Sequence, residues 1–174
     1  MTRFSASKLA ASAALVLTSA SVLCADPPPP PEVQQLFVFA GAWRGKLELV
    51  QPGQPAQTLD FQFDCKAVEA AWAVTCSAVE KGADGTTTEA DVLGYDPNAK
   101  LVHFFTVDNA GETHDHKGRW TSADTLALEH TGTLEGKPFS EKLTIVFRGR
   151  ELTADFVGTA GGTEVYRGKI SAKK

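Results

Sequence analysis

The sequence predicts an all-β protein, in which about ten antiparallel strands form an up-and-down barrel behind one short N-terminal helix. From residue 43 onward, apolar and polar residues alternate with a period of two, as in strands that bury one face. Turn sequences rich in Gly, Pro, Asn and Asp interrupt this alternation about every 8–12 residues. A closed barrel leaves no exposed strand edge, which favours it over the alternative of a two-sheet sandwich.

The first element, residues 1–25, has the features of a secretory signal peptide. Two basic residues precede an apolar, small-residue run over residues 9–23, and the small residue Ala25 follows. We expect export by the Sec route, cleavage near Ala25 and a secreted or periplasmic location. The alternative is a lipoprotein acylated at Cys24, which Leu23 disfavours because lipoprotein processing prefers a small residue before the cysteine.

A linker and a helix are predicted between this leader and the strands. Residues 26–31 form a Pro-rich linker, whose five consecutive prolines adopt an extended conformation and act as a spacer. Apolar residues at helical spacing then predict a helix over residues 32–42, with Gly41 as the stop signal. The barrel domain is expected over residues 32–172.

The ten predicted strands each alternate apolar with polar residues. Their ranges are 43–50, 58–68, 72–80, 87–95, 100–107, 113–120, 125–133, 139–147, 152–158 and 164–170. The four prolines of this region lie at strand ends or in loops, where a missing N–H removes no hydrogen bond between strands.

Composition and charge restrict the partners. The full chain has a formal net charge of -4, and removal of the leader takes away two basic residues and no acidic ones. An acidic domain without a basic face argues against nucleic-acid binding. Apart from the leader, no apolar run is long enough to span a bilayer, so we expect no membrane association unless Cys24 is lipidated.

Two short motifs carry a resemblance to a known family. They are Leu36-Phe37-x-x-Ala40-Gly41-x-Trp43-x-Gly45 and Leu93-Gly94-Tyr95-Asp96. Over residues 32–172 the chain resembles bacterial secreted proteins of unknown function with a calycin-like barrel, akin to lipocalins, fatty-acid-binding proteins and nitrobindins. The resemblance implies a barrel with a lumen and no assigned reaction, and its nitrobindin side implies haem as one candidate cofactor. Relatives often have Gly-Gly where this chain has Ala70-Ala71.

The two cysteines that follow the leader predict a disulfide. If the hairpin turns at Ala70-Ala71, Cys65 lies directly opposite Cys76, on the face that also carries Phe61 and Phe63. An oxidising compartment outside the cytoplasm would allow the bond to form. The alternative is two small buried thiols that pack without bonding.

All four histidines are expected on the inner face of the barrel. In the strand 113–120, His114 and His116 alternate with charged residues that must face solvent. A two-residue turn at Asn109-Ala110 would place His103 opposite His116, and a three-residue turn over 122–124 would place His130 opposite His116 as well. Directly opposed Cβ atoms lie about 4.5–5.5 Å apart, close enough for imidazoles to converge.

These histidines suggest a metal site. His103, His114, His116 and His130 could present ring nitrogens to zinc or another transition metal, with a bound water as nucleophile. Glu112, near the rim, could be a further ligand or a general base. Two alternatives stay open, in which the histidines hold the polar end of a non-metal ligand or only fill the lumen with polar groups. The acidic pairs Asp60/Asp64 and Glu135/Glu141 are expected in solvent.

Three functions follow from these features. The first is a secreted barrel that binds a small molecule in a lumen lined by Phe61, Phe63, Trp72, Phe105 and Trp120. The second is a metal-dependent enzyme that uses the histidine cluster. The third is a structural envelope protein without a ligand. The common hydrolase and nucleotide-binding motifs are missing from the sequence, so an enzymatic activity is not indicated.

Overall fold

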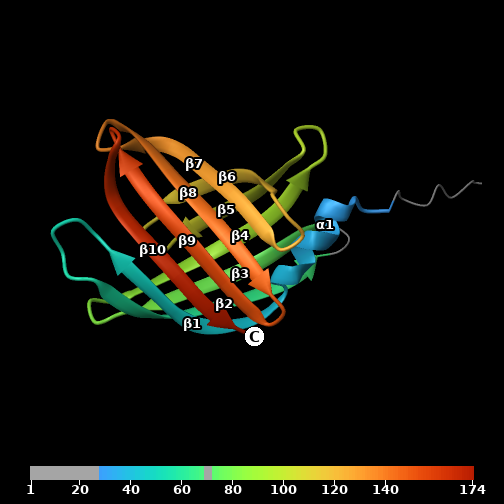
Figure 1. Cartoon of the computed structure of the whole chain (residues 1–174), viewed down its shortest axis with the longest axis horizontal. Helices are drawn as coiled ribbons and strands as arrows, with labels where there is room; N and C mark the ends of the chain where they lie inside the picture. Colours follow the sequence, from blue (N-terminus) through green and yellow to red (C-terminus); the bar gives the residue numbers. More distant parts are fainter. Residues whose placement is uncertain (1–27, 69–71) are drawn as a thin grey trace, which may run out of the picture.

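The computed structural model describes residues 28–68 and 72–174 of the chain (Figure 1). The predicted signal peptide, the start of the Pro-rich linker and the Ala70-Ala71 turn lie outside the described residues. Within the described part of the chain, no helix is long and apolar enough to cross a membrane.

A short helical segment precedes ten strands. The helical segment comprises α1 (Pro31–Leu36) and the 3-10 helix η1 (Phe37–Phe39). The strands are β1 (Gly41–Val50), β2 (Gln57–Val68), β3 (Ala73–Lys81), β4 (Thr86–Asp96), β5 (Leu101–Asp108), β6 (Thr113–Trp120), β7 (Thr125–Leu134), β8 (Lys137–Arg148), β9 (Glu151–Ala160) and β10 (Thr163–Lys173). All ten predicted strands are confirmed, with ends within three residues of the predicted ones.

The strands form one closed antiparallel barrel (Figure 1). Each strand pairs with its neighbours in the sequence, and β1 pairs with β10 to close the ring. The predicted up-and-down barrel is therefore confirmed, and the two-sheet sandwich is wrong. Closure pairs every strand on both sides, so backbone N–H and C=O groups find partners all around the ring.

The helical segment covers one end of the barrel, which we call the closed end (Figure 1). Val33, Leu36 and Phe39 are fully buried there, and the indole N–H of Trp43 donates a 2.7 Å hydrogen bond to the carbonyl oxygen of Phe39. The helix ends earlier than predicted because Gly41 and the residue after it pair with β2 instead of continuing the helical turn.

The predicted disulfide is confirmed. Cys65 on β2 lies opposite Cys76 on β3, and the two sulfurs are bonded. Both side chains are buried on the inner face, next to Phe63 and Val74. The hairpin register inferred from a turn at Ala70-Ala71 is therefore the register that the structure has.

Gly45 allows the closing strands to approach each other. It lies opposite Ala172 on β10, and a Cβ atom at Gly45 would lie 1.9 Å from the carbonyl oxygen of Ser171. Backbone atoms cannot give way as the end of a flexible side chain can, so any larger residue must separate β1 from β10. Gly94 on β4 makes a useful contrast because a Cβ atom there meets nothing within 4 Å.

We predict that Gly45→Ala lowers the free energy of unfolding by about 2 kcal/mol or more, because it forces the closing strands apart. Gly94→Ala, the matched control, should change that free energy by less than about 1 kcal/mol. Urea unfolding of both variants, followed by tryptophan fluorescence, makes the comparison. Equal stability of the two variants would show that β1 and β10 can accommodate a side chain at position 45 without separating.

Candidate functional site

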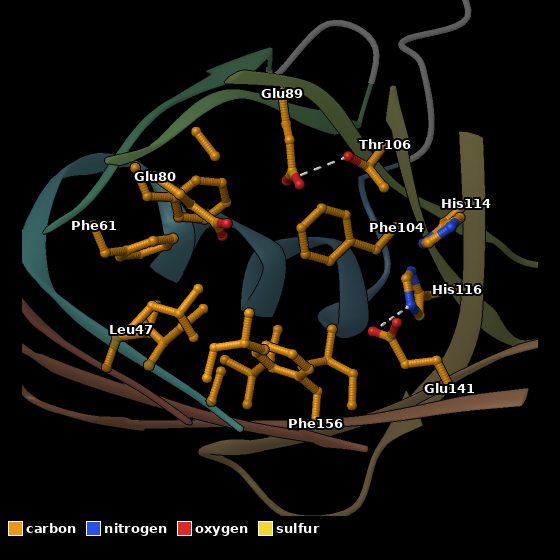
Figure 2. A pocket seen from close by; sticks show the side chains of 18 of the residues that line it. Leu47, Phe61, Glu80, Glu89, Phe104, Thr106, His114, His116, Glu141 and Phe156 are labelled. Atoms are coloured by element: carbon orange, nitrogen blue, oxygen red, sulfur yellow. Dashed lines mark hydrogen bonds and ion pairs between the residues drawn. The ribbon is translucent and has the colours of Figure 1, made fainter. Parts of the chain in front are cut away.

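The barrel encloses a cavity of about 350 Å³, and side chains from several strands point into it (Figure 2). This volume is in the range typical of small-molecule sites. Phe39 of η1 forms part of its floor, so the helical segment closes the lumen at one end. The other end, where the β1–β2, β3–β4 and β5–β6 turns lie, is the open end.

The ionisable lining residues are confined to one level of the cavity. Apolar side chains line the floor in the halves of the strands nearer the closed end; they include Phe39, Phe63, Phe104, Ile145, Leu152 and Ala154. The ionisable lining residues all lie in the strand halves nearer the open end; they are Glu80, Glu89, His114, His116, Glu141 and Tyr166. The bottom of the cavity is therefore apolar, whereas the mouth combines all the ionisable groups with further apolar side chains such as Leu49 and Phe156.

Two of the four histidines face the cavity. His114 and His116, two residues apart on β6, both line it, and their ring centroids are 5.7 Å apart. His116 is buried, with 5% of its surface exposed. The inward orientation predicted for these two residues from the alternation in β6 is the orientation seen.

His103 does not belong to this group. The prediction placed it inside, but β5 pairs with β6 one residue out of the predicted register, so Phe104 instead of His103 lies opposite His116. A one-residue change of register reverses the faces of a strand. His103 therefore lies on the outer surface, where its Nδ1 is 3.1 Å from the carboxylate of Asp115.

The turn between β5 and β6 explains this error. The loop contains three residues instead of two, because the N–H of Asp108 bonds to the carbonyl of Glu112 and Gly111 takes a positive φ of 84°. The Asp108 carboxylate stabilises this loop by accepting the N–H groups of Ala110 and Glu112, each at 2.8 Å. An Asp at the start and a Gly at the end of a turn indicate this loop type, so the sequence carried the signal.

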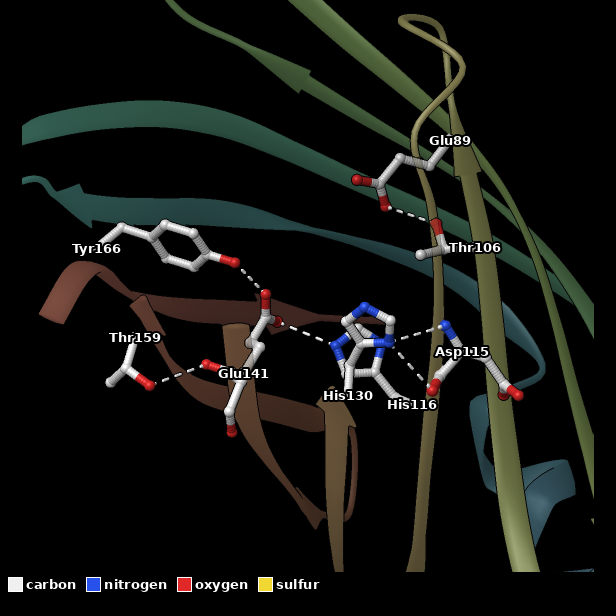
Figure 3. A network of polar contacts seen from close by, with 9 residues as sticks. Glu89, Thr106, Asp115, His116, His130, Glu141, Thr159 and Tyr166 are labelled. Carbon is white, nitrogen blue, oxygen red and sulfur yellow. Dashed lines mark hydrogen bonds and ion pairs between the residues drawn. The ribbon is translucent and has the colours of Figure 1, made fainter. Parts of the chain in front are cut away.

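His130 lies beside the cavity but is not one of its lining residues. The β6–β7 register is the predicted one, and the ring of His130 stacks on that of His114 with centroids 4.7 Å apart. Its Nδ1 lies 3.3 Å from both the backbone nitrogen and the carbonyl oxygen of Asp115, so this ring nitrogen is already occupied by the backbone (Figure 3). Glycine at position 132 leaves room for the ring, whose Nε2 would lie 3.3 Å from a Cβ atom there.

The sequence reasoning missed Glu141. It was expected in solvent, yet it is 8% exposed and its Oε1 lies 3.1 Å from Nε2 of His116 (Figure 3). The alternation in β8 carried the signal, because Glu141 has the same parity as the buried residues Phe139 and Ile145. Glu112, the acidic residue proposed instead, lies exposed in the turn before β6.

Tyr166 completes the polar network. Its hydroxyl donates a hydrogen bond to Oε2 of Glu141 (Figure 3). A bulge in the β9–β10 pairing next to Tyr166 sets its register, and its ring lies over Gly158, where a Cβ atom would be 2.5 Å from the ring. A glycine and a bulge thus place this hydroxyl at the carboxylate.

Burial and hydrogen bonding shift the pKa values of this network in different directions. Burial alone would raise the pKa of Glu141, but hydrogen bonds from His116 and Tyr166 outweigh it and hold that pKa below its ordinary value. Burial lowers the pKa of His114, so this imidazole is neutral at neutral pH. Burial, and then the charge of Glu141, raises the pKa of the Tyr166 hydroxyl.

A second polar group, which we call the acidic group, consists of Glu80, Glu89 and Asp91 on β3 and β4. Glu80 and Glu89 point into the cavity (Figure 2), and Thr106 lies 3.5 Å from a carboxylate oxygen of Glu89. Burial, with a smaller contribution from Glu80, raises the pKa of Glu89 to about 8. Asp91 is only 2% exposed, and neither of its oxygens has a hydrogen-bond partner among the described residues.

The predicted aromatic lining is only partly found in the cavity. Phe61 and Phe63 line it, and their role in ligand binding stays a prediction. Phe105 was expected inside but is 41% exposed on the outer face, because of the register change in β5. Trp72 lies in the turn before β3 and has a positive φ of 51°. Its side chain therefore does not follow the inward–outward alternation of the strand, and it does not line the cavity. Trp120 instead lines a separate hollow between α1 and β4–β6.

Comparisons with known proteins establish the fold and nothing finer. The chain matches no family model and no curated protein. Among solved structures it resembles Rv2717c from M. tuberculosis, with a TM-score of 0.65 and 17% identity over 83% of this chain and 98% of that one. It also resembles the S-type phycobiliprotein lyase CPES from Guillardia theta, with a TM-score of 0.56 and 12% identity over 83% of this chain and 97% of that one.

These likenesses show that the chain shares the closed antiparallel barrel fold of these two proteins. Closed β-barrels of moderate size can enclose a ligand cavity, and this barrel encloses the cavity described above. Within the described residues, His114, His116 and Glu141 are the one group of histidine, cysteine and acidic side chains that could hold a metal ion, since their ligand atoms lie within 4.8 Å of one another. Haem binding, which the sequence resemblance suggested, stays a prediction.

We predict that Glu89→Gln stabilises the protein above neutral pH. In the wild type, Glu89 stays protonated up to about pH 8 when folded but ionises near its ordinary pKa of 4.5 when unfolded, so stability falls as pH rises through this interval. Glutamine removes this loss. The variant's advantage in free energy of unfolding should grow across the interval and reach about 2 kcal/mol or more above pH 8.

Urea unfolding at about pH 5 and about pH 9 measures this difference. The matched control is Glu48→Gln, which removes an exposed carboxylate from the outer face of β1 and should leave the pH dependence unchanged. If Glu89→Gln lost stability with pH as steeply as the wild type does, the carboxyl would not be held protonated in the barrel.

Proposed function

We propose that this protein binds a small amphipathic molecule in the barrel lumen, with an apolar body on the cavity floor and a basic nitrogen at the mouth. One observation carries the proposal: the cavity has an apolar floor, three carboxyl groups at its mouth, and no lysine or arginine among its lining residues. A cavity of this size with a few convergent polar groups is typical of ligand sites.

The floor suits an alkyl or aromatic body. Phe39, Phe63 and Phe104 pack against one another with ring centroids 6.4 Å apart and form an apolar surface at the bottom of the cavity. Burial of apolar ligand surface against such rings contributes about 25 cal/mol per Å².

The mouth selects the polar end by charge. Glu141, whose pKa is held below its ordinary value, repels a ligand carboxylate, and no lysine or arginine among the lining residues offsets this repulsion. Burial keeps Glu89 protonated, so its side chain offers a carboxylate no positive charge either. A protonated amine meets favourable charge at the same place. We therefore expect the cavity to discriminate against fatty acids and in favour of amines of the same length.

The histidines have a smaller part in this proposal than the sequence suggested. His114, which is neutral because burial lowers its pKa, can exchange a hydrogen bond with a ligand but does not supply charge. In this proposal Glu80 and Glu89 of the acidic group contact the basic nitrogen. The alternative of a structural envelope protein without a ligand becomes one outcome of the binding experiment.

We predict that octylammonium binds most tightly, octanol less tightly and octanoate most weakly, with affinities that differ by about tenfold or more at each step. The reason is that a single close charge pair in a partly buried site contributes about 1–2 kcal/mol or more. Isothermal titration calorimetry with the three compounds tests this order. The affinity for octylammonium should also rise as pH increases to about 8, because binding favours the ionised form of Glu89.

Paired variants locate the binding site. The double variant Glu80→Gln/Glu89→Gln should lose the preference for octylammonium over octanol, while the surface control Glu48→Gln keeps it. A preference for octanoate, or equal binding of all three compounds by the wild type, would contradict the proposed ligand class. No binding of any of them would favour the structural alternative.

We further propose that the protein acts outside the cytoplasm. The leader-like residues 1–25 support export, and the Cys65–Cys76 disulfide is of a kind that persists in oxidising compartments. Intact mass measurement of the protein from a bacterial host with Sec export should give a chain that begins at Asp26. A chain that begins at a lipid-modified Cys24 would establish the lipoprotein alternative, and an uncleaved chain in the cytoplasm would contradict export.

A further inference from the structure

We infer that His114, His116 and Glu141 form a binding site for one divalent transition metal ion of the zinc type. The site lies on β6 and β8 at the mouth of the cavity, away from the acidic group of β3 and β4 (Figure 2). It shares Glu141 with the proposed amine site but does not require the amine, because its other two ligands are the histidines of β6.

The spacing of the ligand atoms suits such an ion. Two ligands at zinc–ligand distances of about 2.0–2.1 Å and tetrahedral angles lie about 3.3 Å apart. Nε2 of His116 and Oε1 of Glu141 are 3.1 Å apart, so the ion can enter between them with little movement. The ligand atom of His114 lies within 4.8 Å of both, and a small rotation of its side chain brings it into range.

The surroundings of Glu141 support it as a ligand. The Tyr166 hydroxyl donates to Oε2 and leaves Oε1 directed at His116 (Figure 3). Ligating carboxylates are usually held in this way by an outer hydrogen bond, which fixes their orientation. Entry of the ion replaces the His116–Glu141 hydrogen bond with two metal–ligand bonds and releases the proton shared between them.

The other two histidines are not ligands in this arrangement. His103 lies on the outer surface of β5, with Asp115 as its partner. His130 commits Nδ1 to the backbone of Asp115 and stacks on the ring of His114. Two imidazoles and one carboxylate remain, a ligand set typical of zinc and of related divalent transition metals.

Three protein ligands leave at least one coordination position open. His114, His116 and Glu141 all line the cavity, so that position faces its interior (Figure 2). When bound, a metal of this kind acts as a Lewis acid toward a water or a ligand group at the open position. The nitrogen ligands favour zinc or cobalt over magnesium and calcium, which prefer all-oxygen sites.

The test uses the protein purified without a histidine tag and freed of metal by a chelator. Titration with Co²⁺ should produce the visible absorption of a tetrahedral or five-coordinate cobalt site, and Zn²⁺ should abolish it at one equivalent per chain. Excess Mg²⁺ or Ca²⁺ should have no effect. Glu141→Gln and His114→Ala should each weaken Co²⁺ binding by about 100-fold or more, since each removes one of three ligands.

His103→Ala is the matched control, because it removes a histidine from the outside of the same pair of strands and should leave Co²⁺ binding unchanged. Glu141→Gln is nearly isosteric with the wild type, and circular dichroism confirms that each variant is folded. The inference is overturned if the folded wild type takes up no Co²⁺ or Zn²⁺. It is also overturned if His103→Ala abolishes binding while Glu141→Gln retains it.

Discussion

Closure of the ten strands into one ring is the constraint on which the rest of the structure depends. Because β1 pairs with β10, no strand has a free edge, and each strand must direct alternate side chains into a single enclosed space. The closing contact requires Gly45, and the helical segment then seals one end with Phe39. Every inward residue is consequently either part of the core or part of the cavity, and the parity of a residue within its strand decides its environment.

The ionisable groups that line the cavity lie near the open end of the barrel, away from the apolar floor. The floor near η1 is apolar, while the carboxyl groups, the two histidines and Tyr166 lie in the strand halves toward the open end. Burial of these carboxyl groups still disfavours their charged forms, since it raises the pKa of Glu89 to about 8 and that of Asp91 to about 6. Residues that destabilise an otherwise regular barrel are expected at functional sites, where binding supplies the missing interactions.

Most of the fold could be predicted from the sequence, because alternation and turn chemistry are local signals that every strand repeats. The Cys65–Cys76 pairing and the β6–β7 register followed from turn lengths alone. The site was harder to predict, because it depends on how strands pair. One extra residue in the β5–β6 turn moved His103 to the outer surface. Glu141 was overlooked although alternation in β8 marks it as an inward residue, and its partner His116 lies two strands away.

The two polar groups of the cavity are tied together by charge even though they lie on different strands. Burial raises the pKa of Asp91, and the charge of His116 on one side partly offsets this increase. Burial, then Glu80 and then Asp91 raise the pKa of Glu89 on the other side. A positive charge at either position lowers the pKa of the remaining carboxyls and so removes part of their desolvation cost. A cation bound in the lumen, whether a metal ion or an amine, would therefore stabilise the folded barrel in two ways, by its own contacts and by favouring the ionised form of the buried carboxyl groups. In the unfolded chain these carboxyl groups are solvated, so a cation gives no comparable stabilisation there.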